Sequence, residues 1–156
     1  LAGGGQTDAS GMRDGVKIEL FDVHDILQPR SIGSHVFGRS GSGREGNDDP
    51  HALTLYPPDA GRLRIALPID VFATPRQDVP DLFDWTYSGT HLLEIDGIGG
   101  SPQLAVKGVI KTAEPGATDS LPPYVVPRRA VMHHDAVFVV DGATLIGRQW
   151  DGVTQF

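Results

Sequence analysis

Hydrophobic and polar residues alternate along this chain in short runs, and glycine or proline closes most of them. The 20 glycines and 12 prolines leave no apolar stripe with the period of an α-helix. The runs are rich in β-branched residues, so the pattern predicts an all-β protein. The expected strands are Val16–Asp22, Ser31–Gly38, Ala52–Tyr56, Arg62–Pro68, Thr86–Asp96, Gln103–Thr112, Arg129–His134, Ala136–Val140 and Thr144–Gln149.

Turn residues indicate how these strands connect. Asp141 and Gly142 are expected to supply the positive backbone angles of a two-residue hairpin. YPPDAG, residues 56–61, predicts a second hairpin connection. Longer loops are expected at residues 39–50, 75–85 and 114–127, and loops of such length are usually functional or mobile. Residues 1–10 are expected to be a flexible segment that precedes a single domain over residues 11–156.

Two units of the sequence repeat weakly. IELFDVHDILQPRSIGSHVF aligns with HLLEIDGIGGSPQLAVKGVI, which places Asp22 against Asp96 at an offset of 96 − 22 = 74 residues. The segments that begin at Ala52 and Ala130 also resemble each other, at an offset of 130 − 52 = 78 residues. Such offsets favour one strand-rich unit used twice, of the size of a propeller blade with a long insertion.

Several motifs then occur in an order that resembles a known family. DVHDILQPR between two strands is followed by GSGREG, HALTLYP, RLRIALPI, SGTHLLEID and RRAVMHHDAVFVVDGATLIG. Together they resemble the secreted bacterial proteins with a C-terminal β-propeller domain distantly related to WD40 repeats. The resemblance runs from about Gly11 to the end of the chain. The sequence departs from the family pattern at His24, where the family has a small residue, and at Ile26, where the family has proline.

The resemblance implies antiparallel propeller-type blades in an incomplete propeller. It implies the last two strands of one blade, a complete blade over residues 52–112 and part of a third. Because open blade edges are usually covered, the expected partners are the remaining blades of the parent chain or another protein. The chain begins LAGGGQTDASG, with neither an initiator methionine nor a signal peptide, so we expect it to be part of a longer protein.

The resemblance also implies a secreted, periplasmic or cell-surface location, but it carries over no catalytic residue. The favoured function is a non-catalytic exported scaffold or recognition module that binds a protein, peptide or glycan. The alternative is a propeller-type hydrolase or lyase with its site at the central funnel, where blade loops converge.

Charge narrows the range of partners. Thirteen basic and 20 acidic residues give a formal net charge of −7, which argues against nucleic acid. No apolar run approaches the roughly 20 residues of a membrane-spanning helix. The chain has no cysteine, which excludes disulfides and thiolate chemistry.

The candidate site residues fall in two loops. Asp48, Asp49 and His51 form the densest group of potential metal ligands, and clustered oxygens suit calcium. Their spacing does not match an EF-hand, so a solvated acidic turn competes with the metal interpretation, and no other cofactor is expected. Trp85 and Tyr87 end the insertion DVPDLFDWTY and could form a binding surface for sugar or peptide. Packing onto the blade is favoured, because large aromatic side chains are usually buried.

Other patterns predict little chemistry. GSGREG is followed by NDDP rather than by the helix that a nucleotide site needs. Strand alternation would place His133 and His134 on opposite faces, where they could not chelate a metal together unless the chain bends between them. The G-x-S-x-G pattern of lipase-like hydrolases is absent, and no catalytic set is predicted.

The stretch IELFDVHDILQPRSIGS concentrates three acids and a histidine within a few residues. Alternation separates Glu19 from Asp22, so the charged residues do not simply converge. Asp22 and Asp25 are interpreted as turn formers whose side chains bond nearby backbone amides. His24 is then expected to be exposed to solvent.

Overall fold

The computed structural model folds the chain into three antiparallel sheets. It describes residues 2–7, 13–44, 52–77, 79, 81–116, 122 and 127–152. Sheet A contains strands β1 (Ala2–Thr7), β2 (Arg13–Asp22) and β3 (Arg30–Phe37), in that order. Sheet B contains β4 (Gly43–Arg44), β5 (Thr54–Asp59), β6 (Arg62–Pro75), β7 (Phe83–Asp96) and β8 (Gln103–Ala113). Sheet C contains β9 (Arg128–His133), β10 (Ala136–Asp141) and β11 (Thr144–Gln149), followed by the short 3₁₀ helix η3 (Trp150–Gly152).

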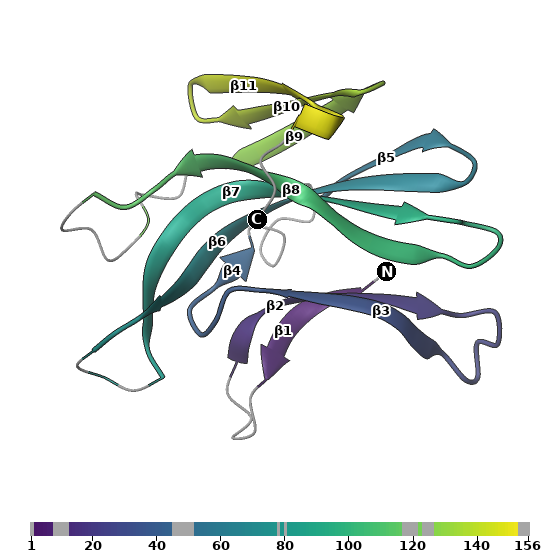
Figure 1. The fold of residues 1–156 in the computed structure, drawn as a ribbon, viewed down its shortest axis with the longest axis horizontal. Helices are drawn as coiled ribbons and strands as arrows, with labels where there is room; N and C mark the ends of the chain where they lie inside the picture. Colours follow the sequence, from purple (N-terminus) through teal and green to yellow (C-terminus); the bar gives the residue numbers. More distant parts are fainter. Residues whose placement is uncertain are drawn as a thin grey trace.

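The sheets stack face to face, with sheet B between sheets A and C (Figure 1). Each junction is filled by side chains that alternate along the strands, as the period of a β-strand requires. The layer between sheets A and B contains Val16, Ile18, Leu20, Phe37, Ile65, Leu67, Ile69, Val71, Leu93 and Ile95. The layer between sheets B and C contains Ala66, Leu92, Ile110, Ala130, Met132, Val137, Val139 and Trp150.

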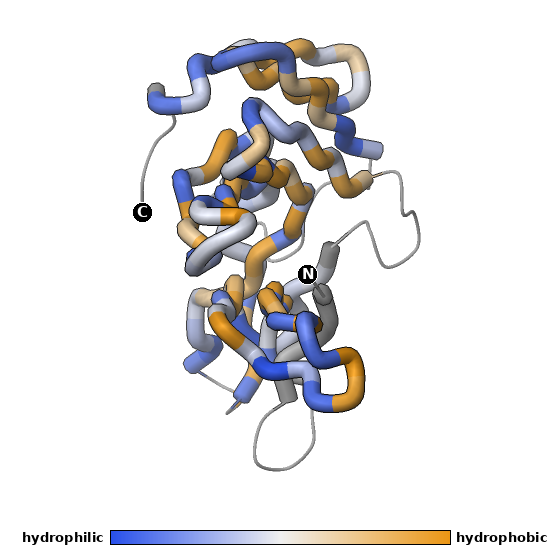
Figure 2. The backbone as a smooth tube through the Cα atoms, turned by 90° about the vertical axis from the view of Figure 1, so that its right-hand side faces the viewer, coloured by the Kyte–Doolittle hydropathy of each residue, from blue (hydrophilic) through white to orange (hydrophobic). Residues whose placement is uncertain are grey.

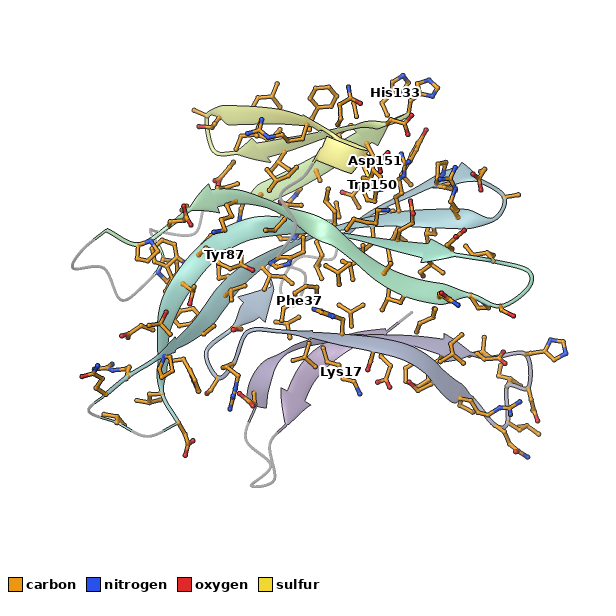
Figure 3. All side chains as sticks on the ribbon, in the orientation of Figure 1. Lys17, Phe37, Tyr87, His133, Trp150 and Asp151 are labelled. Carbon is orange, nitrogen blue, oxygen red and sulfur yellow. The ribbon has the colours of Figure 1, made fainter. Side chains whose placement is uncertain are left out.

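The two outer faces of this stack differ in character. On sheet A, Lys17 points away from sheet B and forms an ion pair of 2.8 Å with Glu19, whereas Phe37 points into the layer between the sheets (Figure 3). On sheet C, the residues that alternate with the buried ones include the exposed apolar side chains of Val131, Phe138, Val140 and Leu145. The outer face of sheet A therefore carries an ion pair, whereas the outer face of sheet C carries a group of exposed apolar side chains.

All nine expected strands are present, and the all-β prediction is confirmed. β6 runs to Pro75 although the sequence predicted its end at Pro68. Proline cannot donate to a sheet ladder, but residues 67–68 lie between the part of β6 that pairs with β5 and the part that pairs with β4. The strand can therefore continue through Pro68. Because β6 ends at Pro75 and β7 begins at Phe83, the loop expected over residues 75–85 is shortened to residues 76–82.

Sheet A, which is the first blade, has three strands, whereas the sequence predicted two. β1 pairs with β2 through Ala2↔Glu19 to Gly5↔Val16, inside the segment expected to be flexible. This pairing is a backbone interaction, so the glycines of AGGGQT do not prevent it even though they have low strand propensity. β5, β6, β7 and β8 form the expected complete blade, with the short strand β4 extending the same edge as β5.

The hairpin between β10 and β11 is a two-residue turn, as predicted, but its positions differ by one. Asp141 pairs with Thr144 and ends β10, so Gly142 and Ala143 form the loop. The positive backbone angle is at Gly142 alone, with φ of 57°. Glycine at the first loop position is typical of the type II′ turn, whose twist matches that of the strands. No helix in the described part of the chain is long and apolar enough to cross a membrane.

Candidate binding cleft between two outer turns

A cleft of about 730 Å³ opens between the β2–β3 turn of sheet A and the β7–β8 turn of sheet B. β3 and β8 are the outer strands of their sheets, and Gly33 of β3 lies against Leu104 of β8. The two turns are the segments that the 74-residue repeat aligns, so equivalent parts of two blades form the walls. The lining residues are Asp22, His24, Ile32, Gly99, Gly100, Ser101, Pro102 and Gln103.

The wall from sheet A is a turn held by its own acids. Asp22 Oδ1 accepts the amide of His24 at 2.9 Å, and Asp25 Oδ1 accepts the amide of Leu27 at 3.0 Å. These bonds confirm that Asp22 and Asp25 are turn formers. His24 is exposed, as expected. The turn residues between the acids are therefore free to project their side chains outward.

The wall from sheet B depends on a left-handed glycine. Gly97 has φ of +79°, and a Cβ there would lie 2.6 Å from the carbonyl oxygen of Ser101. Only glycine fits this position without a clash. The amide of Ile98 bonds to the carbonyl of Gly61 at 3.0 Å, which fixes the turn to the neighbouring β5–β6 hairpin. A Cβ at Gly99 would meet no atom within 4 Å, so this wall leaves backbone open to the cleft.

Exposed aliphatic side chains gather on the β2–β3 turn. Ile26 is 82% exposed and Leu27 is 87% exposed, and Val23 on the same turn is also exposed. Among the exposed aliphatic residues, Ile32 lines the cleft itself. Figure 2 shows the hydrophobic tip at the β2–β3 turn. Single exposed apolar residues are ordinary, but a group of them on one turn marks a contact surface.

The two turns carry an acidic balance. Residues 22–30 and 96–103 contain Asp22, Asp25 and Asp96 against Arg30, which gives −3 + 1 = −2 with histidine neutral. Each of these aspartates uses Oδ1 to hold a turn amide, since Asp96 also accepts the amide of Gly97 at 2.9 Å. Of the three aspartates, Asp22 lines the cleft, whereas Asp96 lies opposite Arg62 of β6.

Trp85 and Tyr87, the aromatic candidates for a binding surface, both lie on β7 but do not form a common exposed surface. Trp85 is buried, with 2% of its surface exposed, and its Nε1 donates to Ser88 Oγ at 3.2 Å. Tyr87 is half-buried, stacks on His91 at 5.8 Å and lies under the ammonium group of Lys111 at 5.1 Å. Burial raises the pKa of the Tyr87 hydroxyl to about 12. Trp85 thus packs into the protein, the arrangement favoured from the sequence.

The predicted metal ligands Asp48, Asp49 and His51 lie outside the described residues, so the calcium site stays a prediction. In the described part of the chain, no group of three or more histidine, aspartate or glutamate residues could hold a metal ion. His133 and His134 are not separated to opposite faces, because the chain bends between them and the ring centroids lie 4.2 Å apart. His134 has φ of +50° in the β9–β10 turn, and this bend removes the strand alternation.

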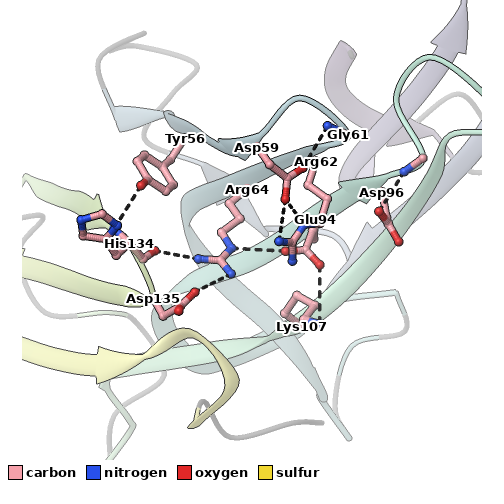
Figure 4. A network of polar contacts seen from close by, with 11 residues as sticks. Tyr56, Asp59, Gly61, Arg62, Arg64, Glu94, Asp96, Lys107, His134 and Asp135 are labelled. Atoms are coloured by element: carbon pink, nitrogen blue, oxygen red, sulfur yellow. Dashed lines mark hydrogen bonds and ion pairs between the residues drawn. The ribbon is translucent and has the colours of Figure 1, made fainter.

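A buried ionic network joins sheet B to sheet C (Figure 4). The Arg64 guanidinium on β6 donates to Glu94 at 3.3 Å, to the His134 carbonyl at 2.7 Å and to Asp135 at 2.9 Å. Its carbon Cζ also lies 4.7 Å from the centre of the Trp150 ring. Trp150 is buried and its amide donates to the Asp135 carbonyl, so this residue anchors the end of the last strand.

A second buried group resembles catalytic chemistry only in its residue types. Ser88 Oγ donates to Asp70 Oδ1 at 2.6 Å, and Arg128 of β9 donates to the same oxygen at 2.7 Å. Ser88 and Arg128 are buried. A serine whose proton is held by an arginine-paired carboxylate is not activated as a nucleophile, since activation requires a free base. The group fastens sheet C to sheet B.

Sequence reasoning did not find the cleft or the Arg64 network. Arg64 and Glu94 pair across β6 and β7, and their contact depends on a strand register that spacing alone does not give. The cleft had a usable signal in the repeat, because Pro29 and Pro102 end its two aligned turns. Equivalent turns of adjacent blades lie side by side, so the alignment of these two turns was the signal that could have indicated a shared cleft.

A family model described as "Beta propeller domain" matches residues 1–151. No curated protein and no solved structure matches the sequence. The matched range covers all three sheets and includes β1, β4 and both turns that line the cleft.

Proposed function

Because this chain belongs to the family of β-propeller domains, we propose that it is a non-catalytic exported recognition module that binds another protein or a peptide. The observation that carries the proposal is the cleft between the outer turns, together with the exposed aliphatic side chains of the β2–β3 turn that forms one of its walls. Propellers host both binding and catalysis, so the site must decide between them. This site offers apolar contact area on turns that are held by hydrogen bonds.

The exposed apolar side chains of the two turns favour a polypeptide over a glycan. Sugars are usually held against flat aromatic rings, whereas the exposed apolar residues here are branched aliphatics: Val23, Ile26, Leu27, Ile32 and Ile98. Such side chains gain binding energy by covering apolar partner surface, at about 25 cal/mol per Å². The hydrolase or lyase alternative draws no support from Ser88 and Asp70, which are engaged with Arg128 between the sheets.

The double variant Ile26→Ser/Leu27→Ser tests the recognition role. Labelled wild-type protein is applied to an array of random dodecapeptides and to a glycan array. We expect peptide spots whose signal falls about tenfold or more in the variant, because two buried aliphatic side chains contribute at least that much. Melting temperatures should agree, since both residues are exposed.

Leu145→Ser is the matched control, because Leu145 is an exposed leucine on the outer face of sheet C. It should leave the peptide signals unchanged. Binding to glycans alone, peptide signals equal in wild type and variant, or no peptide signal at all would each contradict the recognition role.

We also infer that the outer face of sheet C receives a further blade, from the parent chain or another protein. By their places in the aligned hairpins, Phe138 and Val140 of β10 correspond to Arg64 and Ala66 of β6, which face sheet C. The same face of the next sheet is thus apolar and exposed. An apolar sheet face is the surface that a packed sheet buries.

Phe138→Ser measured in two contexts tests this packing. In the present chain the substitution should change the melting temperature little, because Phe138 is partly exposed. In the longer product of the same gene it should cost about 2–3 kcal/mol, because a buried aromatic is then lost. Leu82→Ser, at an exposed leucine, should change the melting temperature equally little in both proteins. Equal effects of Phe138→Ser in both proteins would argue against a covering blade.

Export is part of the proposal and rests on the sequence resemblance. The upstream region of the gene should encode a signal peptide. Cell fractionation of the full-length product provides the check, and a cytoplasmic product without a leader would remove this part of the proposal.

A further inference from the structure

A row of aromatic rings crosses the junction between sheets A and B. The ring of His91 on β7 lies 4.3 Å from the ring of Phe37 on β3, and the Phe37 ring lies 4.5 Å from that of His35. On its own strand, His91 stacks on Tyr87 at 5.8 Å. We infer that this row is an acid-sensitive switch, in which protonation of His91 opens the junction between sheets A and B and leaves the junction between sheets B and C closed.

The position of His91 makes a positive charge on its ring costly. The residue is fully buried, and it shares its face of β7 with Leu93 and Ile95, which belong to the apolar layer between sheets A and B. A charged group in an apolar layer loses the water that would stabilise it. Protonation of His91 is therefore easier when sheet A moves away from sheet B and water reaches the ring.

Nearby positive charges add to this cost. Burial, together with the positive charges of His35 on β3 and Arg128 on β9, lowers the pKa of His91 to about 3. The carboxylate of Asp70 on β6 is engaged by Arg128 at 2.7 Å. The closed arrangement of the sheets thus favours the neutral form of His91.

The other strands packed around this histidine present apolar side chains or positive charge. In register, Leu67 of β6 and Val109 of β8 lie opposite it. Further along β8, the ammonium group of Lys111 lies 5.1 Å from the tyrosine ring that stacks on the histidine. On β2, Lys17 and Glu19 pair with each other on the outer face of sheet A. In the described part of the chain, this layer therefore consists of apolar side chains and the row of rings.

The junction between sheets B and C is held in a different way. Arg64 donates to Asp135 at 2.9 Å and Arg128 donates to Asp70 at 2.7 Å, so two ion pairs cross this junction. Among the residues that the structure describes, His91 is the only buried histidine. Protonation of a buried histidine therefore acts on one of the two junctions.

The direction of the response follows from the affinity of each state for the proton. Once the junction opens, His91 is expected to regain its ordinary pKa of 6.5, so the opened state binds the proton more tightly than the closed state. The ratio of opened to closed molecules therefore rises as pH falls below 6.5. From about pH 7.5 to about pH 5, this ratio should rise about 30-fold through His91 alone. Burial also lowers the pKa of His35, which adds to the rise.

The same movement removes the cleft between the outer turns. Its walls are the β2–β3 turn of sheet A and the β7–β8 turn of sheet B, so the walls separate when the two sheets separate. Acid then releases a peptide bound in the cleft. This consequence rests on the proposed recognition role, whereas the opening of the junction does not and is measured without a ligand.

Two cysteine variants measure the two junctions separately, because the chain has no cysteine of its own. Val16→Cys places a thiol in the layer between sheets A and B, and Val139→Cys places one in the layer between sheets B and C. The rate of reaction with dithiodipyridine, divided by the rate of the same variant unfolded in urea at the same pH, reports how often each layer opens. From about pH 7.5 to about pH 5, which is above the usual range of carboxylate titration, this relative rate should rise about 30-fold or more for Val16→Cys and much less for Val139→Cys.

Histidine variants of the Val16→Cys protein identify the group that responds. His91→Leu should remove most of the rise, and His24→Gln, at an exposed histidine, should leave it unchanged. His35→Gln, at a partly buried histidine, should reduce the rise. If His91→Leu does not fold, His35→Gln decides, and an undiminished rise there overturns the inference.

Three further results would overturn the inference. Equal rises for Val16→Cys and Val139→Cys would mean that acid unfolds the whole protein rather than one junction. A rise for Val16→Cys that persists in His91→Leu would mean that another group responds to acid. No rise for Val16→Cys would mean that the junction stays closed. None of these results depends on peptide recognition, which the arrays test separately.

Discussion

Replacing Arg64 with methionine is expected to lower the free energy of unfolding by about 3–5 kcal/mol, although methionine keeps much of the apolar volume. The substitution leaves the Glu94 carboxylate between two sheets, with 11% of its side chain exposed, an ion pair with Lys107 Nζ at the longer distance of 3.7 Å and a weaker electrostatic attraction to Arg62. A charge in such a place is costly without a close partner. Urea unfolding followed by tryptophan fluorescence measures the effect, because Trp150 lies against the guanidinium.

Two controls attribute this loss to the buried charge. Arg62→Met changes the same residue type in the same strand, but its ion pair with Asp59 is exposed, so unfolding should change little. In Arg64→Met/Glu94→Met both charges are removed, and most of the stability should return, as happens when a buried ion pair is replaced by apolar residues. A double variant as unstable as Arg64→Met would mean that packing or the contacts to sheet C, rather than the stranded charge, dominate.

The stability of the wild type is expected to fall as pH decreases from about 6.5 toward 3, in part because of His91. This histidine is fully buried, and burial lowers its pKa to about 3, helped by the positive charges of His35 and Arg128. The unfolded chain therefore binds a proton in this range that the folded chain excludes, and proton binding favours the unfolded state. The full effect is on the order of 4 kcal/mol.

The variant His91→Leu isolates this contribution. Its stability should depend less steeply on pH between 6.5 and 3 than that of the wild type, whatever its absolute stability. His24→Gln, at an exposed histidine, should retain the wild-type slope. Aspartates and glutamates also titrate in this window, so the comparison is between slopes measured by denaturant unfolding at each pH. Identical slopes for wild type and His91→Leu would show that His91 is charged at little cost in the folded protein.

The strands were predictable because their side chains alternate, and alternation directly reflects burial. Ile18 and Leu20 alternate with Lys17 and Glu19, and the structure buries the first pair while the second forms an ion pair on the outer face. Failures occurred where side chains carry no such signal. β1 is glycine-rich and is held by backbone pairing, which leaves no pattern of apolar residues in the sequence.

The site was less predictable because it depends on which turns become neighbours. DVHDILQPR was correctly interpreted as a turn held by Asp22 and Asp25, yet the cleft beside Ile26 and Leu27 exists only because the β7–β8 turn lies next to them. His133 and His134 show the same limit, since a single left-handed residue brings together rings that alternation would separate. The sequence predicted the hydrogen bonding within a turn, but it did not predict which turns and side chains lie next to each other in space.

The difference between the two outer faces has a consequence for self-association. Identical copies stacked head to tail, with sheet C of one on sheet A of the next, would form an open filament, because such a contact never closes on itself. In that filament the apolar residues Phe138 and Val140 would meet Lys17 and Glu19, whose ion pair would lose its water. Burying the Lys17–Glu19 ion pair against an apolar sheet costs free energy, so this pair disfavours the stacking of identical copies through these two faces.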